Sequence, residues 1–272
     1  MQSGLEKRPI GIFDSGIGGL TVASAINKVL PNETLIYFGD TAHLPYGEKS
    51  SVSIRGFSAE IASFLVNQGC KAIVIACNSA SAVATNTVRR VVPSSIPVIN
   101  VIDPTVNYVA SEIRSGRVGV IATKATVNSR IYARRIVKQN QNLKVSMLAT
   151  PLLVSMIEEG FFNNNISQAI INSYLEKSTL QNIEALILGC THFPLIKKEI
   201  EKHYSGSVQV IDSSDTVAQE LKRILDKKNI LNTGKPNRKH HFYVSDLTPA
   251  FAESTAIFFG EKLRLEKKKL WL

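Results

Sequence analysis

The segment Ala72-Ile-Val-Ile-Ala-Cys77-Asn-Ser79 decides how this chain is expected to fold. Its first five residues form a short, unbroken apolar run rich in Ile, which is typical of a strand buried on both faces of a parallel sheet. Asn and Ser then favour the start of a helix directly after the strand. The segment Leu186-Ile-Leu-Gly-Cys190-Thr-His192 repeats this pattern. The sequence therefore predicts a strand–cysteine–helix unit that occurs twice.

Two further pairs of segments support an internal duplication. Gly11-Ile-Phe-Asp-Ser15 is similar to Gly119-Val-Ile-Ala-Thr123, and Asn100-Val-Ile-Asp103 is similar to Gln209-Val-Ile-Asp212. The offsets within the three pairs lie between 108 and 113 residues, and the pairs follow the same order along the chain. Similar segments at a nearly constant spacing indicate a repeated structural unit.

The rest of the chain alternates between short apolar runs and longer helical patterns. This alternation predicts an α/β protein with parallel sheets. The expected strands are residues 9–13, 34–38, 72–76, 98–102, 118–122, 145–148, 185–188, 208–211 and 241–245. The expected helices are residues 20–30, 50–67, 79–91, 105–115, 129–139, 152–159, 166–179, 194–204 and 216–227.

Together, these patterns predict two pseudo-symmetric parallel-sheet α/β domains with the active site in the cleft between them. The first domain is expected to take residues 1–98 and about 211–272, and the second residues 99–210. Ligands bind such sheets beyond the carboxyl ends of the strands. Two facing domains would place both sets of strand ends around one cleft.

Composition is that of a soluble globular protein. The 272 residues are 44% hydrophobic and 20% charged, and no apolar run reaches the eighteen residues that a transmembrane helix needs. Residues 1–9 are polar, so we expect no signal peptide and a cytoplasmic location. Three cysteines in such a chain are expected to be core residues or reactive thiols, not a disulfide framework.

The net charge of +10 is concentrated toward the C-terminus, where residues 220–272 hold 12 Lys and Arg against 6 Asp and Glu. Residues 262–269 are expected to form a helix end and a basic tail. A nucleic-acid-binding protein is one alternative function. No aromatic or loop motif of a nucleic-acid module accompanies the charge, so we favour a solvated basic face and do not expect nucleic acid as a partner.

The paired cysteines carry the chemistry. Either one alone would be interpreted as a small core residue. However, Cys77 and Cys190 occupy equivalent strand ends, each next to a helix N-terminus, where the pKa of a thiol is expected to fall below about 8.5. Two opposed thiols could remove a proton from one face of a chiral carbon and deliver one to the other face, which is racemisation. Cys70 has no counterpart and is expected in the core or at the surface.

Polar residues at the same strand ends suit an amino-acid substrate. Asp14 and Ser15 precede a glycine-rich turn, Gly16-Ile-Gly18-Gly19, whose backbone N–H groups could approach a carboxylate. This turn matches neither the dinucleotide fingerprint nor the phosphate-binding loop. His240 and His241 have no partner at the spacing of a metal site, so no metal is expected.

These residues are similar to those of the glutamate racemases, within the aspartate/glutamate racemase superfamily. The matching segments span residues 11–20, 37–41, 45–47, 76–78, 119–126 and 188–192. The resemblance implies interconversion of L- and D-glutamate without a metal, pyridoxal phosphate or nucleotide. It also implies that the enzyme supplies D-glutamate for peptidoglycan and forms a homodimer.

The resemblance also implies roles for individual residues. Cys77 would act on the α-proton of D-glutamate and Cys190 on that of L-glutamate, assisted by Asp14 and His192. Either Glu158 or Glu159 would support the histidine. The substrate site would be formed by Asp14, Ser15, Tyr46, Gly47, Asn78, Ser79, Thr123, Thr126, Thr191 and His192.

Two other enzyme classes remain open at this point. One is a racemase of the same superfamily that acts on aspartate or a hydantoin. The other is a thiol redox enzyme, which requires the two cysteines to approach within about 7 Å between Cα atoms.

Overall fold

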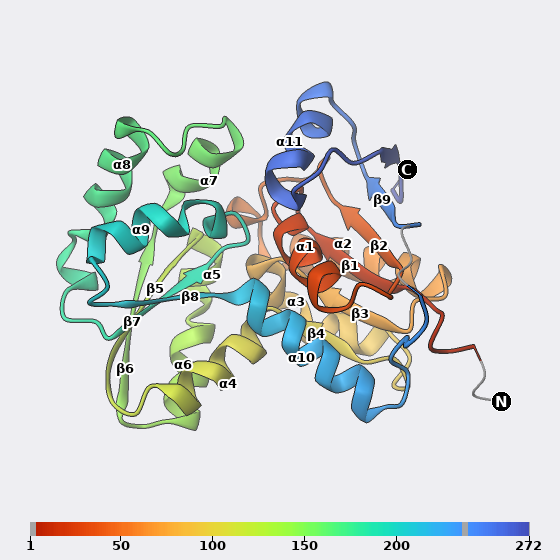
Figure 1. Cartoon of the computed structure of the whole chain (residues 1–272), viewed down its shortest axis with the longest axis horizontal. Coiled ribbons are helices and arrows are strands. Elements are labelled where there is room, and N and C mark those ends of the chain that lie inside the picture. The colour runs from red at the N-terminus through yellow and green to blue at the C-terminus, as the bar shows by residue number, and fades with distance from the viewer. Residues whose placement is uncertain (1–3, 236–238, 272) are drawn as a thin grey trace.

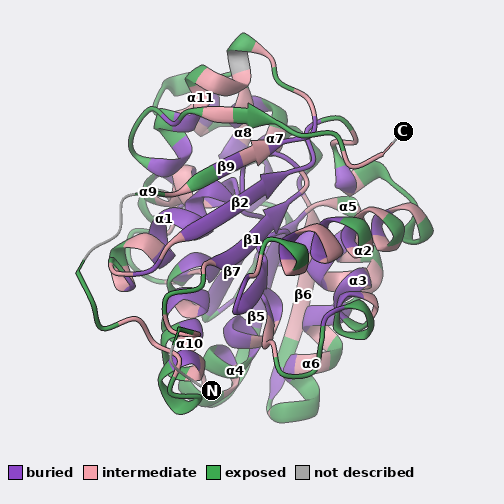
Figure 2. Ribbon diagram, turned by 90° about the vertical axis from the view of Figure 1, so that its right-hand side faces the viewer, coloured by how far each residue is buried: buried purple, intermediate pink, exposed green. Residues whose placement is uncertain are grey.

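The computed structural model describes residues 4–235 and 239–271. The chain forms two lobes, each built around one sheet with helices packed against it (Figure 1). The central strands are buried, and the more exposed residues lie mainly on the surrounding helices and loops (Figure 2). This is the layered arrangement that nearly continuous apolar strands require, because both faces of each sheet must be covered.

Sheet A contains six parallel strands in the order β10-β9-β2-β1-β3-β4. Sheet B contains four parallel strands in the order β6-β5-β7-β8. The strands of sheet A are β1 (Ile10–Asp14), β2 (Leu35–Gly39), β3 (Ala72–Ile75), β4 (Val98–Asn100), β9 (His241–Val244) and β10 (Leu265–Lys267). Those of sheet B are β5 (Gly116–Ala122), β6 (Leu143–Ala149), β7 (Ala185–Gly189) and β8 (Gln209–Asp212).

The predicted duplication is visible in the strand order. The run β2-β1-β3-β4 in sheet A corresponds to β6-β5-β7-β8 in sheet B, so the first four strands of each half occupy equivalent positions. Two parallel-sheet α/β domains are therefore confirmed. The strands that precede the two cysteines, β3 and β7, occupy equivalent positions in the two sheets. Each pairs with a central strand, β1 in sheet A and β5 in sheet B.

Eleven α-helices connect the strands within the described residues. They are α1 (Leu20–Val29), α2 (Ser51–Asn67), α3 (Asn78–Val91), α4 (Ile102–Glu112), α5 (Lys124–Ser129), α6 (Ile131–Gln139), α7 (Pro151–Glu158), α8 (Asn165–Leu175), α9 (Lys197–Tyr204), α10 (Ser213–Lys227) and α11 (Pro249–Phe259).

One apolar core runs through both lobes. Along β1, Ile10 and Ile12 face a core that includes residues of α1, α10 and sheet B, whereas Phe13 faces a separate core formed with α2 and α3. This alternation follows from the two-residue period of a strand. Helices α4 and α10 pack against each other where the chain passes between the lobes, and their apolar residues belong to the continuous core.

The C-terminal region differs from the expectation. Residues 262–269 do not form a helix end, because residues 265–267 form the edge strand β10, which pairs with β9. Backbone pairing with an open sheet edge outweighs the helix propensity of Leu, Glu and Lys in so short a segment. Helix α11 was not predicted, although Thr248 caps it, Pro249 occupies its first turn and Gly260 ends it with a left-handed conformation. These are standard helix start and stop signals.

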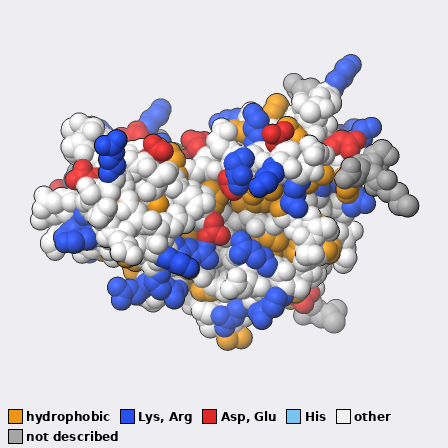
Figure 3. All heavy atoms as spheres, turned by 90° about the horizontal axis from the view of Figure 1, so that it is seen from below, with side chains coloured by type: hydrophobic (Ala, Val, Ile, Leu, Met, Phe, Trp, Pro, Cys, Tyr) orange, Lys and Arg blue, Asp and Glu red, His pale blue; other side chains and the backbone are white. Residues whose placement is uncertain are grey.

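Lys and Arg side chains are spread over the underside of both lobes, with acidic side chains among them (Figure 3). Several Lys and Arg side chains of the described residues are paired with carboxylates, including Arg135 with Asp103 and Arg223 with Glu220. Among the helices that the structure describes, none combines the length and apolarity needed to cross a membrane.

A buried ion pair holds the amino end of sheet A, away from the carboxyl ends of the strands. Lys71, one residue before β3, lies 2.6 Å from Glu33, and both side chains are 1% exposed. The Lys71 ammonium also donates to the backbone oxygens of Glu6 and Ile230. These contacts join the N-terminal segment, the α1–β2 turn and the segment after α10.

We predict that Lys71→Met lowers the free energy of unfolding by about 3–5 kcal/mol, because it leaves Glu33 as an unpaired buried carboxylate. Urea unfolding of both proteins measures the difference. Glu201→Gln, which removes the exposed pair of Glu201 with Lys197, is the matched control and should leave the midpoint unchanged. An equal midpoint for Lys71→Met and the wild type would contradict the prediction.

Candidate active site

A cavity of about 340 Å³ lies where the carboxyl ends of both sheets meet. Strand ends of sheet A contribute Asp14 and Cys77, and strand ends of sheet B contribute Thr123 and Cys190. A larger hollow of about 520 Å³ lies between α4, β8 and α10, but it contains neither cysteine. Of the residues predicted for the site, those that line the smaller cavity are Asp14, Ser15, Tyr46, Gly47, Cys77, Asn78, Ser79, Thr123, Glu158, Cys190, Thr191 and His192.

Cys77 caps the N-terminus of α3. Its sulfur accepts a hydrogen bond from the backbone N–H of Ala80 at 3.4 Å and donates to the hydroxyl of Ser15 at 3.6 Å. The expected lowering of the pKa of Cys77 is wrong. Burial and the neighbouring Asp14 raise the pKa of Cys77, and the two hydrogen bonds only partly oppose this. Desolvation of a thiolate in a closed cavity outweighs the helix terminus.

Cys190 faces a histidine–glutamate pair. Its sulfur lies 3.7 Å from Nδ1 of His192, and Nε2 of the same ring lies 2.9 Å from Oε1 of Glu158. Burial by itself lowers the pKa of His192, but the hydrogen bonds with Cys190 and Glu158 raise it to about 10. The ring is therefore an imidazolium at neutral pH. Glu158 makes this contact, whereas Glu159 is exposed at the end of α7.

Asp14 is almost completely buried beside the glycine-rich turn. One carboxyl oxygen accepts hydrogen bonds from the backbone N–H groups of Gly16 and Gly19, at 3.2 and 2.9 Å. The other oxygen has no hydrogen-bond partner. Burial raises the pKa of Asp14, and the positive charge of His192 opposes this increase. The turn thus holds a carboxyl group in the cavity wall with one oxygen unsatisfied.

The absence of a side chain at Gly18 lets the two halves of the site meet. A Cβ atom there would lie 2.3 Å from Cε1 of His192, so a larger residue would displace the imidazolium. The neighbouring Thr21 donates to the backbone oxygen of Thr191 at 2.8 Å. Close approach of backbone to a functional side chain is a frequent reason for glycine.

A pair of hydroxyl groups joins the two lobes close to Cys77. Ser79 of α3 and Thr123 at the end of β5 lie 3.0 Å apart through their hydroxyls. Thr126 is the one predicted site residue that does not line the cavity. It lies behind Thr123 and accepts a hydrogen bond from its hydroxyl at 3.2 Å.

Tyr46 and Gly47 lie on the short helix Tyr46–Glu48, which covers one side of the cavity. The hydroxyl of Tyr46 donates to the buried Asp40 at 2.6 Å, which anchors this loop. A Cβ atom at Gly47 would lie 3.0 Å from the side chain of Thr123, so glycine allows the loop to approach sheet B closely.

Two features of the cavity were not predicted. Thr150 follows β6, lines the cavity and has a buried hydroxyl without a hydrogen-bond partner. The rule that strand ends supply the site would have identified it, since β6 lies beside β5 in sheet B. The ion pair between Lys124 and Glu48, at 3.3 Å, joins the two lobes at the cavity wall. Its two residues are far apart in sequence, and no local pattern connects them.

Within residues 4–235 and 239–271, no cluster of His, Cys, Asp and Glu has the geometry to hold a metal ion. The three cysteines described there are all free. Cys70 lies in the core, where burial raises its pKa to about 12, so this thiol is inert compared with a thiolate.

Known proteins resemble this chain over almost its whole length. A glutamate racemase of Neisseria meningitidis is 42% identical over 258 residues, which is 95% of each chain. The crystal structure of glutamate racemase from Francisella tularensis in complex with D-glutamate has a TM-score of 0.91 and 44% identity, covering 97% of this chain and 98% of that one. A glutamate racemase isoform of Bacillus anthracis also has a TM-score of 0.91, with 34% identity and coverage of 97% and 98%.

The family model for Asp/Glu/Hydantoin racemase matches residues 18–221, a range that contains both cysteines of the cavity. With this match and the similarity of sequence and structure, the chain belongs to the Asp/Glu/Hydantoin racemase family.

Proposed function

We propose that this protein interconverts L- and D-glutamate by proton transfer between the α-carbon and two thiols, Cys77 and Cys190, without a cofactor. The observation that carries the proposal is the presence of one cysteine from each half of the duplicated fold in the wall of the same cavity. The relatives at 42% identity are named glutamate racemases, which favours glutamate over aspartate or a hydantoin.

The surroundings of the two sulfurs differ and suggest their resting states. We assign the starting thiolate to Cys190, because His192, with a pKa of about 10, places a positive charge 3.7 Å from its sulfur. Burial and the nearby Asp14 keep Cys77 as a thiol. A single thiolate also avoids the repulsion between two buried negative charges.

The reaction then proceeds in two balanced steps. The thiolate of Cys190 takes the α-proton of L-glutamate, and the electron pair of the broken C–H bond remains on the substrate. Cys77 next gives its thiol proton to the opposite face of the α-carbon, which produces D-glutamate and leaves a thiolate at Cys77. The reverse direction starts from that thiolate.

The cavity contains groups that suit the carboxylates of glutamate. Two buried polar atoms, Nδ2 of Asn78 and Oγ1 of Thr150, belong to lining residues and have no hydrogen-bond partner in the protein. A buried donor without a partner is costly, so a ligand that accepts these hydrogen bonds gains affinity. Donors placed on the α-carboxylate also stabilise the negative charge that develops when the α-proton leaves.

The same family membership leads us to propose a role for this protein in supplying D-glutamate for peptidoglycan. We also propose that the enzyme is cytoplasmic and works as a homodimer. Measuring its molecular mass in solution tests whether it is a dimer.

We predict that the purified protein, with chelator and without added cofactor, abolishes the circular dichroism of an L-glutamate solution. Cys77→Ser and Cys190→Ser should each lower kcat by about 10²–10⁴-fold, because a hydroxyl is a poor replacement for the proton-transferring thiol. Cys70→Ala is the matched control, since Cys70 is buried outside the cavity, and should retain the wild-type kcat.

Three outcomes would change the proposal in different ways. Loss of the circular dichroism signal with L-aspartate but not with L-glutamate would support the two-thiol mechanism and identify aspartate as the substrate. Full activity in either serine variant would contradict the two-thiol mechanism. No reaction with any acidic amino acid would contradict the function itself.

We predict a shift of the pH profile in Glu158→Gln. In the wild type, kcat/KM for L-glutamate should fall as the pH rises through about 10, where His192 loses its proton and no longer stabilises the thiolate. Removing the Glu158 carboxylate removes an interaction that raises the pKa of His192. The alkaline decline should therefore move to lower pH in the variant, as measured by pH–rate profiles from pH 7 to 11.

Glu159→Gln provides the control, because it removes a neighbouring carboxylate that is exposed. Its profile should coincide with that of the wild type. A Glu158→Gln profile that also coincides with the wild type would show that the ion pair does not control the titration.

A further inference from the structure

Asn78 follows Cys77 directly, and the oxygen and nitrogen of its side-chain amide differ in their hydrogen bonding. Its Oδ1 accepts a hydrogen bond from the hydroxyl of Tyr132 at 2.7 Å. Its Nδ2 is buried and has no partner in the protein, and the residue lines the cavity. The donor end of the amide is therefore available to a ligand, and the acceptor end is occupied.

The residue that occupies the acceptor end comes from the other lobe. Tyr132 lies in the first turn of α6, a helix of the sheet B half, and is completely buried. It does not line the cavity and cannot touch the substrate itself. Burial and the neighbouring Cys190 raise the pKa of its phenol, so the hydroxyl remains a donor throughout the working pH range.

This contact fixes which way the amide faces. The phenol hydrogen needs an acceptor in a buried site, and Oδ1 of Asn78 is the acceptor that it contacts. A rotated amide would turn its NH₂ group toward the phenol and its oxygen toward the cavity, where it would repel a carboxylate. With Oδ1 bonded to Tyr132, only the NH₂ group can face a substrate.

We propose that Tyr132 is a positioning residue for carboxylate binding, which acts from the opposite domain by orienting the amide of Asn78. The inference rests on the proposed function, because it takes the ligand to be an amino-acid carboxylate. The hydrogen bond joins the two lobes, so it exists only while α3 and α6 remain in contact.

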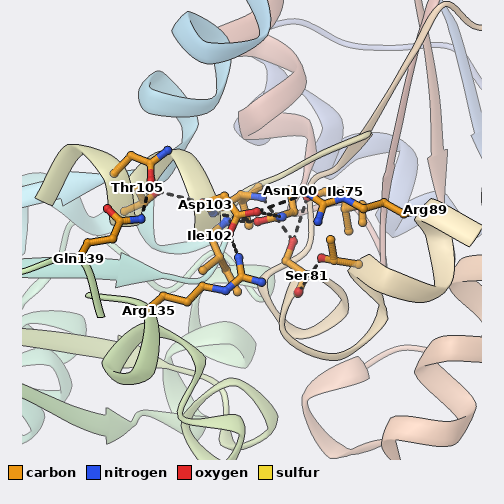
Figure 4. Close-up of polar contacts among 12 residues, drawn as sticks. Ile75, Ser81, Arg89, Asn100, Ile102, Asp103, Thr105, Arg135 and Gln139 are labelled. Carbon is orange, nitrogen blue, oxygen red and sulfur yellow. Dashed lines mark hydrogen bonds and ion pairs between the residues drawn. The ribbon is translucent and has the colours of Figure 1, made fainter. Parts of the chain in front are cut away.

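A second contact keeps α6 next to α3. Asp103, in the first turn of α4, forms ion pairs with Arg89 of α3, at 3.5 Å, and with Arg135 of α6 (Figure 4). Its carboxylate also accepts from Nδ2 of Asn100 at 2.7 Å.

The hydrogen bond of Tyr132 and the ion pairs of Asp103 involve the same face of α3 and the same face of α6. Tyr132 and Arg135 are three residues apart and share one face of α6, whereas Asn78 and Arg89 are eleven apart and share one face of α3. The two helices are therefore tied at two points along their length.

The test compares Tyr132→Phe with the wild type and with Tyr204→Phe. The latter removes another tyrosine hydroxyl of the same domain, one that is buried without a hydrogen-bond partner and lies outside the cavity. In Tyr132→Phe we expect the KM for L-glutamate to rise about tenfold, because the amide is no longer oriented, with kcat changed by less than about threefold. Tyr204→Phe should retain both constants.

A double-mutant cycle separates positioning from a merely structural role. In an Asn78→Ala background there is no amide to orient, so adding Tyr132→Phe should leave KM unchanged. A further increase in KM in the double variant would overturn the proposal, as would an unchanged KM in the single variant.

Stabilisation by D-glutamate in thermal unfolding gives a readout that does not depend on activity. The ligand should raise the Tm of Tyr132→Phe less than that of the wild type at equal concentration. Equal increases would contradict the role of Tyr132 even if the enzyme racemises glutamate. A wild-type protein that binds D-glutamate but does not racemise it would contradict only the proposed function.

Discussion

The contact between the carboxyl edges of the two parallel sheets is the constraint on which the rest of the site depends. Each edge alone offers one cysteine at a helix start and a few polar side chains. Brought together by α4 and α10, the edges enclose a cavity that excludes most of the solvent from both sulfurs. The low polarity of that space raises the pKa of Cys77 and strengthens every charge interaction in the cavity.

Duplication provided two equivalent positions, but the residues around them are not equivalent. Cys77 is accompanied by the Ser15 hydroxyl and the Asp14 carboxyl, whereas Cys190 is accompanied by an imidazolium. A reversible proton transfer between two faces requires one sulfur to start as a thiol and the other as a thiolate. The pseudo-symmetric fold places the two sulfurs, and their neighbours make the surroundings of the two sulfurs different.

The sequence predicts the repeated parallel-sheet fold and most of the candidate site, because these follow from local patterns. Apolar runs mark the strand ends, and four of the residues at those ends line one cavity: Asp14, Cys77, Thr123 and Cys190. The pKa of Cys77 could not be predicted in the same way, since the burial that raises it results from tertiary packing and not from the local sequence. The choice between Glu158 and Glu159 depends on the direction of α7, which tertiary packing determines. Strand β10 was missed because its charged residues favour a helix, and only the open edge of β9 makes it a strand.

The apolar core that continues from one sheet to the other has a consequence for motion. Residues of α1, α4 and α10 belong to one apolar cluster with side chains of both sheets, and α10 contacts strands of each sheet, so the two halves share a packed core. A free hinge needs a few unpacked residues that absorb the rotation, whereas tightly packed helices permit only small sliding movements. The packing therefore favours small shear movements of α4 against α10 over a hinge opening of the two lobes. Wide separation of the lobes would expose the core and compete directly with the stability of the fold.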